Sequence, residues 1–393
     1  MYEELKTNFS VSFDRPWQYI FSAPGRTELG GNHTDHQLGR VLAAAVDLDS
    51  TAAAAENGES LIRVISEGYP MCIIDLADLL AKPEELGSTA ALVRGVAAGI
   101  AQRGHRLRGF DAYVSSRVLP GSGLSSSAAF EVLMGTIINH ISGCGLTPVE
   151  IAQIGQYAEN VYFGKPCGLM DQMASSVGNI IGIDFENPLA PLTETIDYDF
   201  SRSGYSLCII DCGADHADLT DEYAAIPSEL EKVCAFFGKQ YLRQVDEALF
   251  YSKVNELRRA VGDRAVLRAM HVFEENKRVE KEISALKAND FEGYLAQVRA
   301  SGRSSWLYLQ NVVPAGYTEH QELAFALALA DRLLNGRGAC RVHGGGFAGT
   351  IQAFVPDAHL HAFRSGMDAV LGKGACHILS IRRQGGVLLE ERK

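Results

Sequence analysis

The segment from Leu119 to Ala129 reads LPGSGLSSSAA, and the residues after it have the pattern of a buried helix. Two glycines, Gly121 and Gly123, precede a run of three serines at 125–127. Apolar residues then recur at the spacing of one helical face, and they are Phe130, Val132, Leu133, Met134, Ile137, Ile138 and Ile141. The segment therefore predicts a glycine-rich loop that opens into a helix N-terminus.

Such a loop favours the binding of a phosphate. The first backbone N–H groups of a helix have no partner within the helix, and the helix dipole adds partial positive charge. Glycines let the backbone approach a phosphate closely, and serine hydroxyls can cap the helix, donate to phosphate or ligate Mg²⁺. No Gly-Lys-Ser/Thr closes the loop, so it is not a Walker A motif, and a serine-capped structural turn would fit the loop alone. The residues expected to bind a nucleotide are Gly121, Ser122, Gly123, Leu124, Ser125, Ser126 and Ser127.

Three further segments accompany this loop. PGRTELGGNHTD at 24–35 lies upstream, CGLMDQMA at 167–174 lies downstream, and VHGGGFAG at 342–349 lies near the end. The four segments in this order resemble the small-molecule kinases of the GHMP superfamily, and the first is close to the galactokinase signature. The resemblance covers the chain from Phe13 to about Val355. It implies an α+β fold of two domains, an N-terminal domain like domain 2 of ribosomal protein S5 and a ferredoxin-like C-terminal domain, with the active site in the cleft between them.

The composition and the charge fit a small-molecule enzyme of this kind. The 393 residues carry a formal net charge of −12, which argues against binding to nucleic acid or to a membrane surface. The eight cysteines are scattered without paired spacing, so a reduced protein is expected and a zinc site is not. The first ten residues, MYEELKTNFS, lack the pattern of a signal peptide. We therefore expect a cytoplasmic protein, a monomer or weak homo-oligomer, whose partners are a sugar and ATP.

The composition shifts after Ile183, where NPLAP at 187–191 and the acidic residues that follow it indicate a crossing between domains. The predicted N-terminal domain is 1–190 and holds the sugar loop, the phosphate loop and the catalytic aspartate. The predicted C-terminal domain is 191–393 and holds the third glycine-rich segment. Before that boundary, strands are expected at 19–23, 41–55, 61–65 and 110–114. Thr147 and Pro148 are the expected start of a helix that reaches Glu159.

Polar side chains are dense on the glycine-rich stretch after Pro24. Arg26, Glu28, Asn32, His33, Asp35 and His36 lie there within eleven residues. A polyhydroxy ligand needs several oriented donors and acceptors, and such a loop can supply them, although a solvated surface loop is the alternative from composition alone. The resemblance implies that this stretch binds the sugar, and it adds a tyrosine from the second sugar-binding region at 211–223. The expected sugar contacts are Asn32, His33, Thr34, Asp35 and Tyr223.

The resemblance also assigns the catalytic roles. Asp171 is expected to face the hydroxyl that receives the phosphoryl group, either as general base or as the acceptor that orients the nucleophile. Arg26 is the expected cation that bridges Asp171, the attacking oxygen and the phosphoryl group. Glu159 stands twelve residues before Asp171, and with Ser127 it is expected to hold Mg²⁺. The HxxE pattern at His271 and Glu274 is interpreted as structural.

The expected reaction is the ATP-dependent phosphorylation of the C1 hydroxyl of D-galactose. Departures from the family pattern bear on the sugar, because Asn32 and His36 replace the usual Glu and Tyr, and Ile226-Pro227 replaces an arginine pair. A sibling sugar-1-kinase for galacturonate, L-arabinose or N-acetylgalactosamine is therefore the alternative. A non-catalytic sugar-sensing regulator is a further alternative, but the Ser127-Ala128 pair linked to catalysis is intact.

Overall fold

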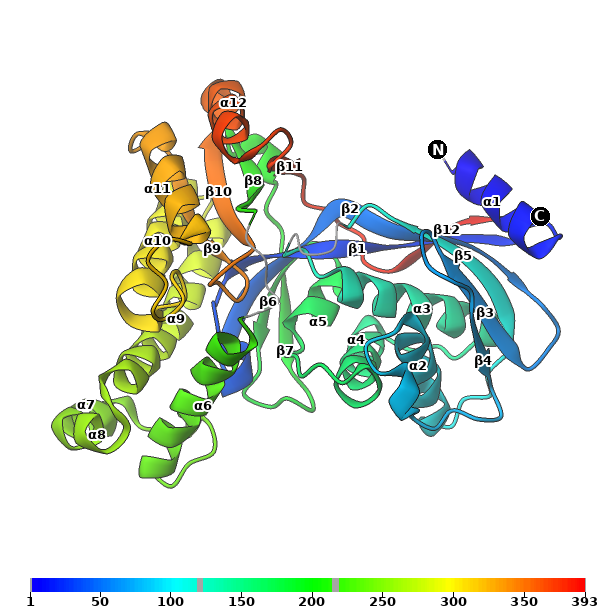
Figure 1. Ribbon diagram of the computed structural model, residues 1–393, viewed down its shortest axis with the longest axis horizontal. Helices are drawn as coiled ribbons and strands as arrows, with labels where there is room; N and C mark the ends of the chain where they lie inside the picture. The colour runs from blue at the N-terminus through cyan, green and yellow to red at the C-terminus, as the bar shows by residue number, and fades with distance from the viewer. Residues whose placement is uncertain (1, 119–122, 214–218, 393) are drawn as a thin grey trace.

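The structure is a computed structural model that describes residues 2–118, 123–213 and 219–392. Its strands are β1 (Tyr19–Gly30), β2 (Arg40–Glu56), β3 (Leu61–Ser66), β4 (Cys72–Asp75), β5 (Phe110–Ser116), β6 (Ile180–Asp184), β7 (Leu192–Ile196), β8 (Tyr205–Asp211), β9 (Ala339–His343), β10 (Thr350–Pro356), β11 (Cys376–Leu379) and β12 (Val387–Glu391). Its α-helices are α1 (Glu3–Phe13), α2 (Thr89–Gln102), α3 (Ser126–Ser142), α4 (Pro148–Tyr157), α5 (Met170–Val177), α6 (Thr220–Phe236), α7 (Glu247–Ser252), α8 (Val254–Val261), α9 (Asp263–Lys287), α10 (Phe291–Ser304), α11 (Glu322–Leu334) and α12 (Leu360–Leu371). Figure 1 shows two lobes, one built on each of two sheets.

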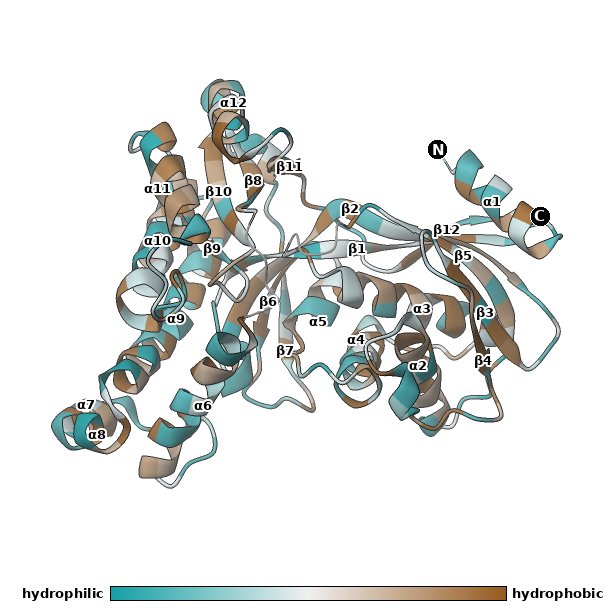
Figure 2. Cartoon of the chain, in the orientation of Figure 1, coloured by the Kyte–Doolittle hydropathy of each residue, from teal (hydrophilic) through white to brown (hydrophobic). Residues whose placement is uncertain are grey.

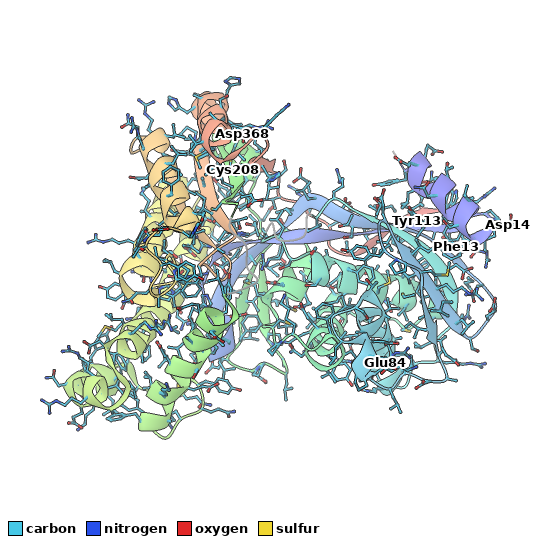
Figure 3. The ribbon with its side chains drawn as sticks, in the orientation of Figure 1. Phe13, Asp14, Glu84, Tyr113, Cys208 and Asp368 are labelled. Atoms are coloured by element: carbon cyan, nitrogen blue, oxygen red, sulfur yellow. The ribbon has the colours of Figure 1, made fainter. Side chains whose placement is uncertain are left out.

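The first sheet has the order β12-β1-β2-β5-β3-β4. In addition, β6 pairs with the N-terminal part of β2, at residues 40–44, and β7 pairs with β6. Its centre is β2, in which runs of alanine at 43–45 and 52–55 are fully buried. Small side chains let helices approach the sheet closely, and α2 to α5 cover one face, with hydrophobic residues along α2 and α3 (Figure 2). On the opposite face, Phe13 at the end of α1 packs in one apolar cluster with Tyr113 (Figure 3).

The second sheet has the order β11-β8-β10-β9, and all of its pairs are antiparallel. Helices connect β8 to β9 and β10 to β11, so the chain follows the β-α-β-β-α-β order of a ferredoxin-like fold. The apolar side chains of α11 and α12 pack on one face of this sheet. The structure thus confirms the two-part α+β fold that the sequence predicts.

An apolar cluster joins the two lobes. It combines Leu29 and Leu42 of the first sheet with Leu207 and Phe354 of the second, and Val279 of α9 packs between them. Two strands that follow residue 191, β7 and β12, pair with β6 and β1 of the first sheet. The first lobe therefore draws strands from beyond the predicted boundary, and the division at 190 stays a prediction. Within the described ranges, no helix is long and apolar enough to cross a membrane.

Two local expectations at the site change in the structure. The strand expected at 19–23 does not end before Pro24. A bulge shifts the β1–β2 register between Pro24 and Arg26, and β1 continues to Gly30. Thr147 caps α4 through a capping box with Pro148 in the first turn, as predicted, but the α-helix ends at Tyr157. A π-helical segment, η3 (Ala158–Phe163), follows and carries Glu159.

Candidate active site

Arg26 and Asp171 meet in a bidentate ion pair, although 145 residues separate them. Arg26 lies on β1 just past the bulge, and Asp171 lies in the first turn of α5. Arg26 Nε donates to Asp171 Oδ1 at 2.6 Å, and Arg26 Nη2 donates to Asp171 Oδ2 at 2.8 Å. The guanidinium is 6% exposed, so the fork is held in one geometry against the carboxylate. The structure confirms that the two residues are paired, and their catalytic roles stay predictions.

The glycine-rich loop reaches the same pair. Arg26 Nη1 donates to the Gly123 carbonyl, and Ser125 Oγ donates to Asp171 Oδ2. Gly123 has φ +71°, and a Cβ there would lie 2.5 Å from Thr350 Oγ1, so only glycine fits. Ser125 is the N-cap of α3 with φ +56°, and its side chain makes no cap hydrogen bond. The α3 N-terminus therefore faces the ion pair; Gly121 and Ser122 lie outside the described residues.

The remaining loop positions divide between packing and polar roles. Leu124 is buried, and its carbonyl accepts a hydrogen bond from Arg26 N at 3.0 Å, which ties the loop to β1. Ser126 begins α3 and is partly exposed. Nucleotide binding by 121–127 stays a prediction, which the helix N-terminus at Ser126 supports.

The electrostatics keep Asp171 ionised. Burial raises the pKa of Asp171, but the charge and hydrogen bonds of Arg26, and the hydrogen bond from Ser125, outweigh burial and hold it below its ordinary value. A carboxylate with so low a pKa is a weak base. Its two oxygens are better suited to orienting a hydroxyl than to removing its proton outright.

Ser127 and Glu159 form the second polar centre of the site. Ser127 Oγ donates to Glu159 Oε1 at 2.9 Å, and Glu159 is 2% exposed. Two ligands on adjacent corners of a Mg²⁺ octahedron with bonds of about 2.1 Å lie about 3.0 Å apart. The two oxygens therefore fit the Mg²⁺ ligands that the resemblance implies. In the described residues there is no group of three or more His, Cys, Asp and Glu side chains arranged for a metal.

Three residues that sequence reasoning missed surround Glu159. Lys165 Nζ lies 3.3 Å from Glu159 Oε1. Gln172 Nε2 donates to Glu159 Oε2 and to Glu131 Oε2, both at 2.9 Å. Burial, and then the charge of Glu159, raise the pKa of Glu131 well above its ordinary value. Gln172 directly follows Asp171 in the quoted segment, but nothing in the sequence indicates that Glu131, on the buried face of α3, reaches it.

The predicted sugar loop follows β1 and lies beside the ion pair. Burial, and then the charge of Asp171, raise the pKa of Asp35 to about 6. His33 Nε2 lies 3.0 Å from the Gly345 carbonyl, and its Nδ1 lies 3.3 Å from His36 Nε2. Burial lowers the pKa of His36 to about 3, so that ring is neutral at physiological pH. The side chain of Asp35 lies against Gly168, where a Cβ would come within 1.8 Å of Asp35 Oδ2.

Thr34 and Asn32 are turned into the protein. Thr34 Oγ1 donates to the Gly31 and Arg40 carbonyls and shapes the loop. Asn32 is fully buried, and its Nδ2 donates to Glu28 Oε1 at 3.1 Å and to the Gly344 carbonyl at 2.7 Å. Its role as a sugar contact stays a prediction, and in the structure its amide hydrogens already have protein partners.

The buried carboxylate of Glu28 lies beside Asn32. Arg341 Nη1 of β9 donates to Glu28 Oε1 at 2.9 Å, and Arg341 Nη2 donates to the Glu28 carbonyl at 2.8 Å. A glutamate at position 32 would place a second carboxylate against Glu28. This contact gives a physical reason why the chain carries an amide where the family pattern has an acid.

Tyr223 lies across the third glycine-rich segment. Its hydroxyl donates to the Gly346 carbonyl at 2.7 Å, and its ring packs edge-on against Phe347. Gly345 allows the ring this close, since a Cβ there would lie 2.6 Å from Tyr223 Cε1. Gly345 also contacts His33 through its carbonyl. Tyr223, the third segment and the sugar loop therefore meet through Gly345 and Gly346.

Helix α9 holds the backbone of the sugar loop from behind. Glu275 Oε1 accepts from Gly31 N and Asn32 N, both at 3.3 Å, and His271 Nε2 lies 3.0 Å from the Asn32 carbonyl. Sequence reasoning paired His271 with Glu274, but Glu274 faces outward toward Lys277. One helical turn separates His271 from Glu275, so the inward-facing acid is four residues on, not three.

Comparisons with known proteins show the family of the chain. The model of the GHMP kinases N terminal domain matches residues 86–179, and the galactokinase galactose-binding signature matches residues 7–56. A galactokinase of Glaesserella parasuis serovar 5 is 32% identical over 92% of this chain and 91% of its own length. A galactokinase of Actinobacillus pleuropneumoniae is 34% identical over 88% of this chain and 87% of its own.

Solved structures share the fold. The crystal structure of Lactococcus lactis galactokinase complexed with galactose superposes with a TM-score of 0.83 at 24% identity, and the match covers 98% of this chain and 99% of that one. Methanococcus jannaschii mevalonate kinase superposes with a TM-score of 0.65 at 15% identity, covering 93% of this chain and 98% of that one.

Proposed function

The chain belongs to the galactokinase family of the GHMP kinases, and on this premise we propose that it transfers the γ-phosphoryl group of ATP to the C1 hydroxyl of D-galactose (EC 2.7.1.6). The observation that carries the proposed mechanism is the Arg26–Asp171 ion pair, which Ser125 at the start of α3 contacts. Asp171 orients the sugar hydroxyl, Arg26 offsets the negative charge of the phosphoryl group, and the α3 N-terminus holds the phosphates of ATP.

Asp171 accepts the hydrogen bond of the C1 hydroxyl and points its oxygen lone pair at the phosphorus. The sugar is held at the other end by the loop after β1, by Asp35 and His33, and by Tyr223 across the third segment. Because the transition state of phosphoryl transfer is loose, the hydroxyl needs little activation before the bond to the leaving oxygen breaks. The proton passes to Asp171 late, when the oxygen has become acidic.

Arg26 offsets the charge that develops during transfer. Its fork is already oriented by Asp171 and by the Gly123 carbonyl, so little reorganisation is needed when the phosphoryl group arrives. The backbone N–H groups at the start of α3 face the same region and would hold the phosphates of the nucleotide. No covalent intermediate with the protein is required.

Ser127 and Glu159 would hold Mg²⁺ in this mechanism. When bound there, the metal would supply positive charge to offset that of the phosphates. The chain contributes a hydroxyl and a carboxylate at matching separation, and Gln172 fixes the rotation of that carboxylate from its other oxygen.

A coupled assay of ATP consumption with a panel of sugars tests the proposed function. We expect turnover with D-galactose, and ³¹P NMR should place the phosphate on C1. Turnover of galacturonate, L-arabinose or N-acetylgalactosamine in preference to galactose would assign a sibling activity. Retained galactose binding without turnover of any sugar would refute the proposed reaction and favour a sugar-sensing protein.

A further inference from the structure

Lys165 lies at the predicted metal and phosphate site, but the mechanism above does not use it. It follows Gly164, which ends η3 with φ +83°, and precedes Pro166. Lys165 N donates to the Glu159 carbonyl at 3.1 Å, so the loop folds back on the segment that carries Glu159. This short return directs the side chain toward the α3 N-terminus.

The ammonium group of Lys165 and the hydroxyl of Ser127 contact the same oxygen of Glu159. Its Nζ lies 3.3 Å from Glu159 Oε1, the same oxygen to which Ser127 Oγ donates at 2.9 Å. The Lys165 side chain is 64% exposed, whereas that of Glu159 is 3% exposed. The carboxylate is therefore fixed and the ammonium is a movable charge on a flexible stem.

Lys165 also acts on Asp171 electrostatically. Its charge is one of the influences that lower the pKa of Asp171, after those of Arg26 and Ser125. Lys165 therefore contacts the carboxylate that would bind the metal and acts electrostatically on the carboxylate that would orient the sugar hydroxyl. Both carboxylates are hydrogen-bonded to serines at the α3 N-terminus, Asp171 to Ser125 and Glu159 to Ser127, so a phosphate held there would lie near both.

We propose that Lys165 is a catalytic residue that binds the terminal phosphate oxygens of the nucleotide, and that it moves to them from Glu159 when the nucleotide arrives. The proposal rests on the proposed function, since it needs a phosphate donor at this site. The movement frees Glu159 Oε1 as a ligand. The ammonium keeps its proton throughout, while the bond from the C1 oxygen to phosphorus forms and the bond to the leaving oxygen of ADP breaks.

The position of Lys165 favours this role over that of a structural counter-ion. An ion pair with so exposed an ammonium contributes little to stability, and Gln172 already holds the buried carboxylate from its other oxygen. Cations aimed at the transferring group act where charge is spread over several oxygens. Arg26 would reach that group from β1, and Lys165 would reach it from the loop that follows η3.

Binding of inorganic tripolyphosphate in EDTA, measured by calorimetry, tests the contact without metal, sugar or turnover. We expect Lys165→Met to weaken binding at least tenfold, Lys165→Arg to weaken it less, and the control Lys239→Met, at an exposed site in the loop after α6, to leave it unchanged. In kinetics, Lys165→Met should raise KM for ATP and lower kcat about 10- to 100-fold, with galactose affinity unchanged. Thermal melts establish that each variant is folded. If Lys165→Met is unfolded, tripolyphosphate binding of Lys165→Arg is compared with that of the wild type instead.

Equal tripolyphosphate affinity in wild type and Lys165→Met would overturn the proposal. A gain in Mn²⁺ affinity without any loss of tripolyphosphate affinity would also overturn it, because Lys165 would then only neutralise Glu159. The proposed function is judged separately by galactose turnover in the wild-type protein. A wild-type protein that binds tripolyphosphate but phosphorylates no sugar would refute the function and not the phosphate contact.

Discussion

Asp35 is a side chain of the proposed sugar site whose charge changes at mildly acidic pH. Burial, and then the charge of Asp171, raise its pKa to about 6, whereas the pKa of His36 is about 3. The folded protein holds the Asp35 proton more tightly than the unfolded chain does, so this residue lowers the free energy of unfolding as pH rises from about 4 to about 6. Ligand binding should have the opposite dependence, because a sugar hydroxyl needs the ionised carboxylate as its acceptor.

Galactose affinity is therefore expected to weaken below pH 6. Calorimetric titration between pH 5 and pH 8 should give a dissociation constant that is flat above pH 7 and rises below 6, by at most about tenfold per pH unit. Asp35→Asn should bind more weakly at pH 7.5 and lose this dependence. A wild-type dissociation constant that does not change with pH would contradict the role of Asp35.

Single residues also mark the limit of the sequence as a guide. Arg26 and Asp171 could be paired because the resemblance assigns both of them to the transferring phosphoryl group. The burial of Asn32 could not be foreseen, since it depends on Glu28 and on Arg341 from the other lobe. Lys165 was missed because a lysine in a short loop has no motif of its own.

At the scale of elements, α9 connects the second lobe to the sugar loop. Glu275 accepts from two backbone N–H groups of that loop, from Ser301 Oγ at 2.6 Å and from Arg278 Nε at 2.6 Å. It is fully buried, and although burial raises its pKa, its partners together lower it to about 2. Helical periodicity predicts that α9 has a buried face, but not that a charged residue on this face anchors a loop far away in the sequence.

Glu275→Gln should loosen the sugar loop. The amide keeps the shape of the side chain but leaves Arg278 without its counter-charge, so we expect the free energy of unfolding to fall by about 3–5 kcal/mol. Galactose affinity should fall about tenfold or more, as measured by calorimetry at a temperature where the variant is folded. The matched control is Glu274→Gln, one residue earlier and exposed, which should change stability by less than about 0.5 kcal/mol. Galactose affinity equal to that of the wild type would show that the clamp does not position the sugar.

A second acid of α9 should make stability depend on pH. Glu282 is fully buried beside Gly30, its two oxygens have no hydrogen-bond partner among the described residues, and burial raises its pKa to about 8. Between about pH 4.5 and 8 the folded protein keeps a proton that the unfolded chain releases, so the free energy of unfolding falls by about 1.4 kcal/mol per pH unit from this group. Above pH 8 the contribution of Glu282 to the free energy of unfolding no longer changes with pH.

Glu282→Gln should remove that dependence. Urea unfolding at pH 5.5 and at pH 8 should show the variant close to the wild type at the lower pH and more stable at the higher. The control is Glu231→Gln, an exposed acid on α6, which should follow the wild type at both values. If the difference between Glu282→Gln and wild type is the same at both pH values, Glu282 is ionised in the folded protein.

The elements themselves were largely predictable. The bounds of β2, β3 and β5 lie within one or two residues of the strands predicted from their apolar runs. The continuation of β1 through Gly30 was not, because Pro24 and Gly25 signal a turn and only the pairing with β2 absorbs them as a bulge. The π-helical segment η3, which follows α4 and carries Glu159, was also not predicted, because the sequence pattern indicated a continuous α-helix.

At the scale of the whole molecule, segments far apart in the chain converge on one place. β1 supplies Arg26, the α3 N-terminus supplies the serines, α5 supplies Asp171, and α6 with the third glycine-rich segment closes the sugar side from the second lobe. The resemblance predicts this convergence, but β7 and β12 show that the two lobes share strands more closely than the predicted boundary suggests.

The central claim is that Asp171 acts on the hydroxyl to be phosphorylated and does not hold the rest of the sugar. Comparison of Asp171→Asn with the wild type, by kcat for galactose phosphorylation and by the dissociation constant of galactose, tests this most directly. We predict a loss of about 10²- to 10⁴-fold in kcat, because the anionic acceptor is gone, with galactose affinity within a few-fold of the wild type. Equal losses in kcat and in affinity, or a variant that retains its turnover, would contradict the account.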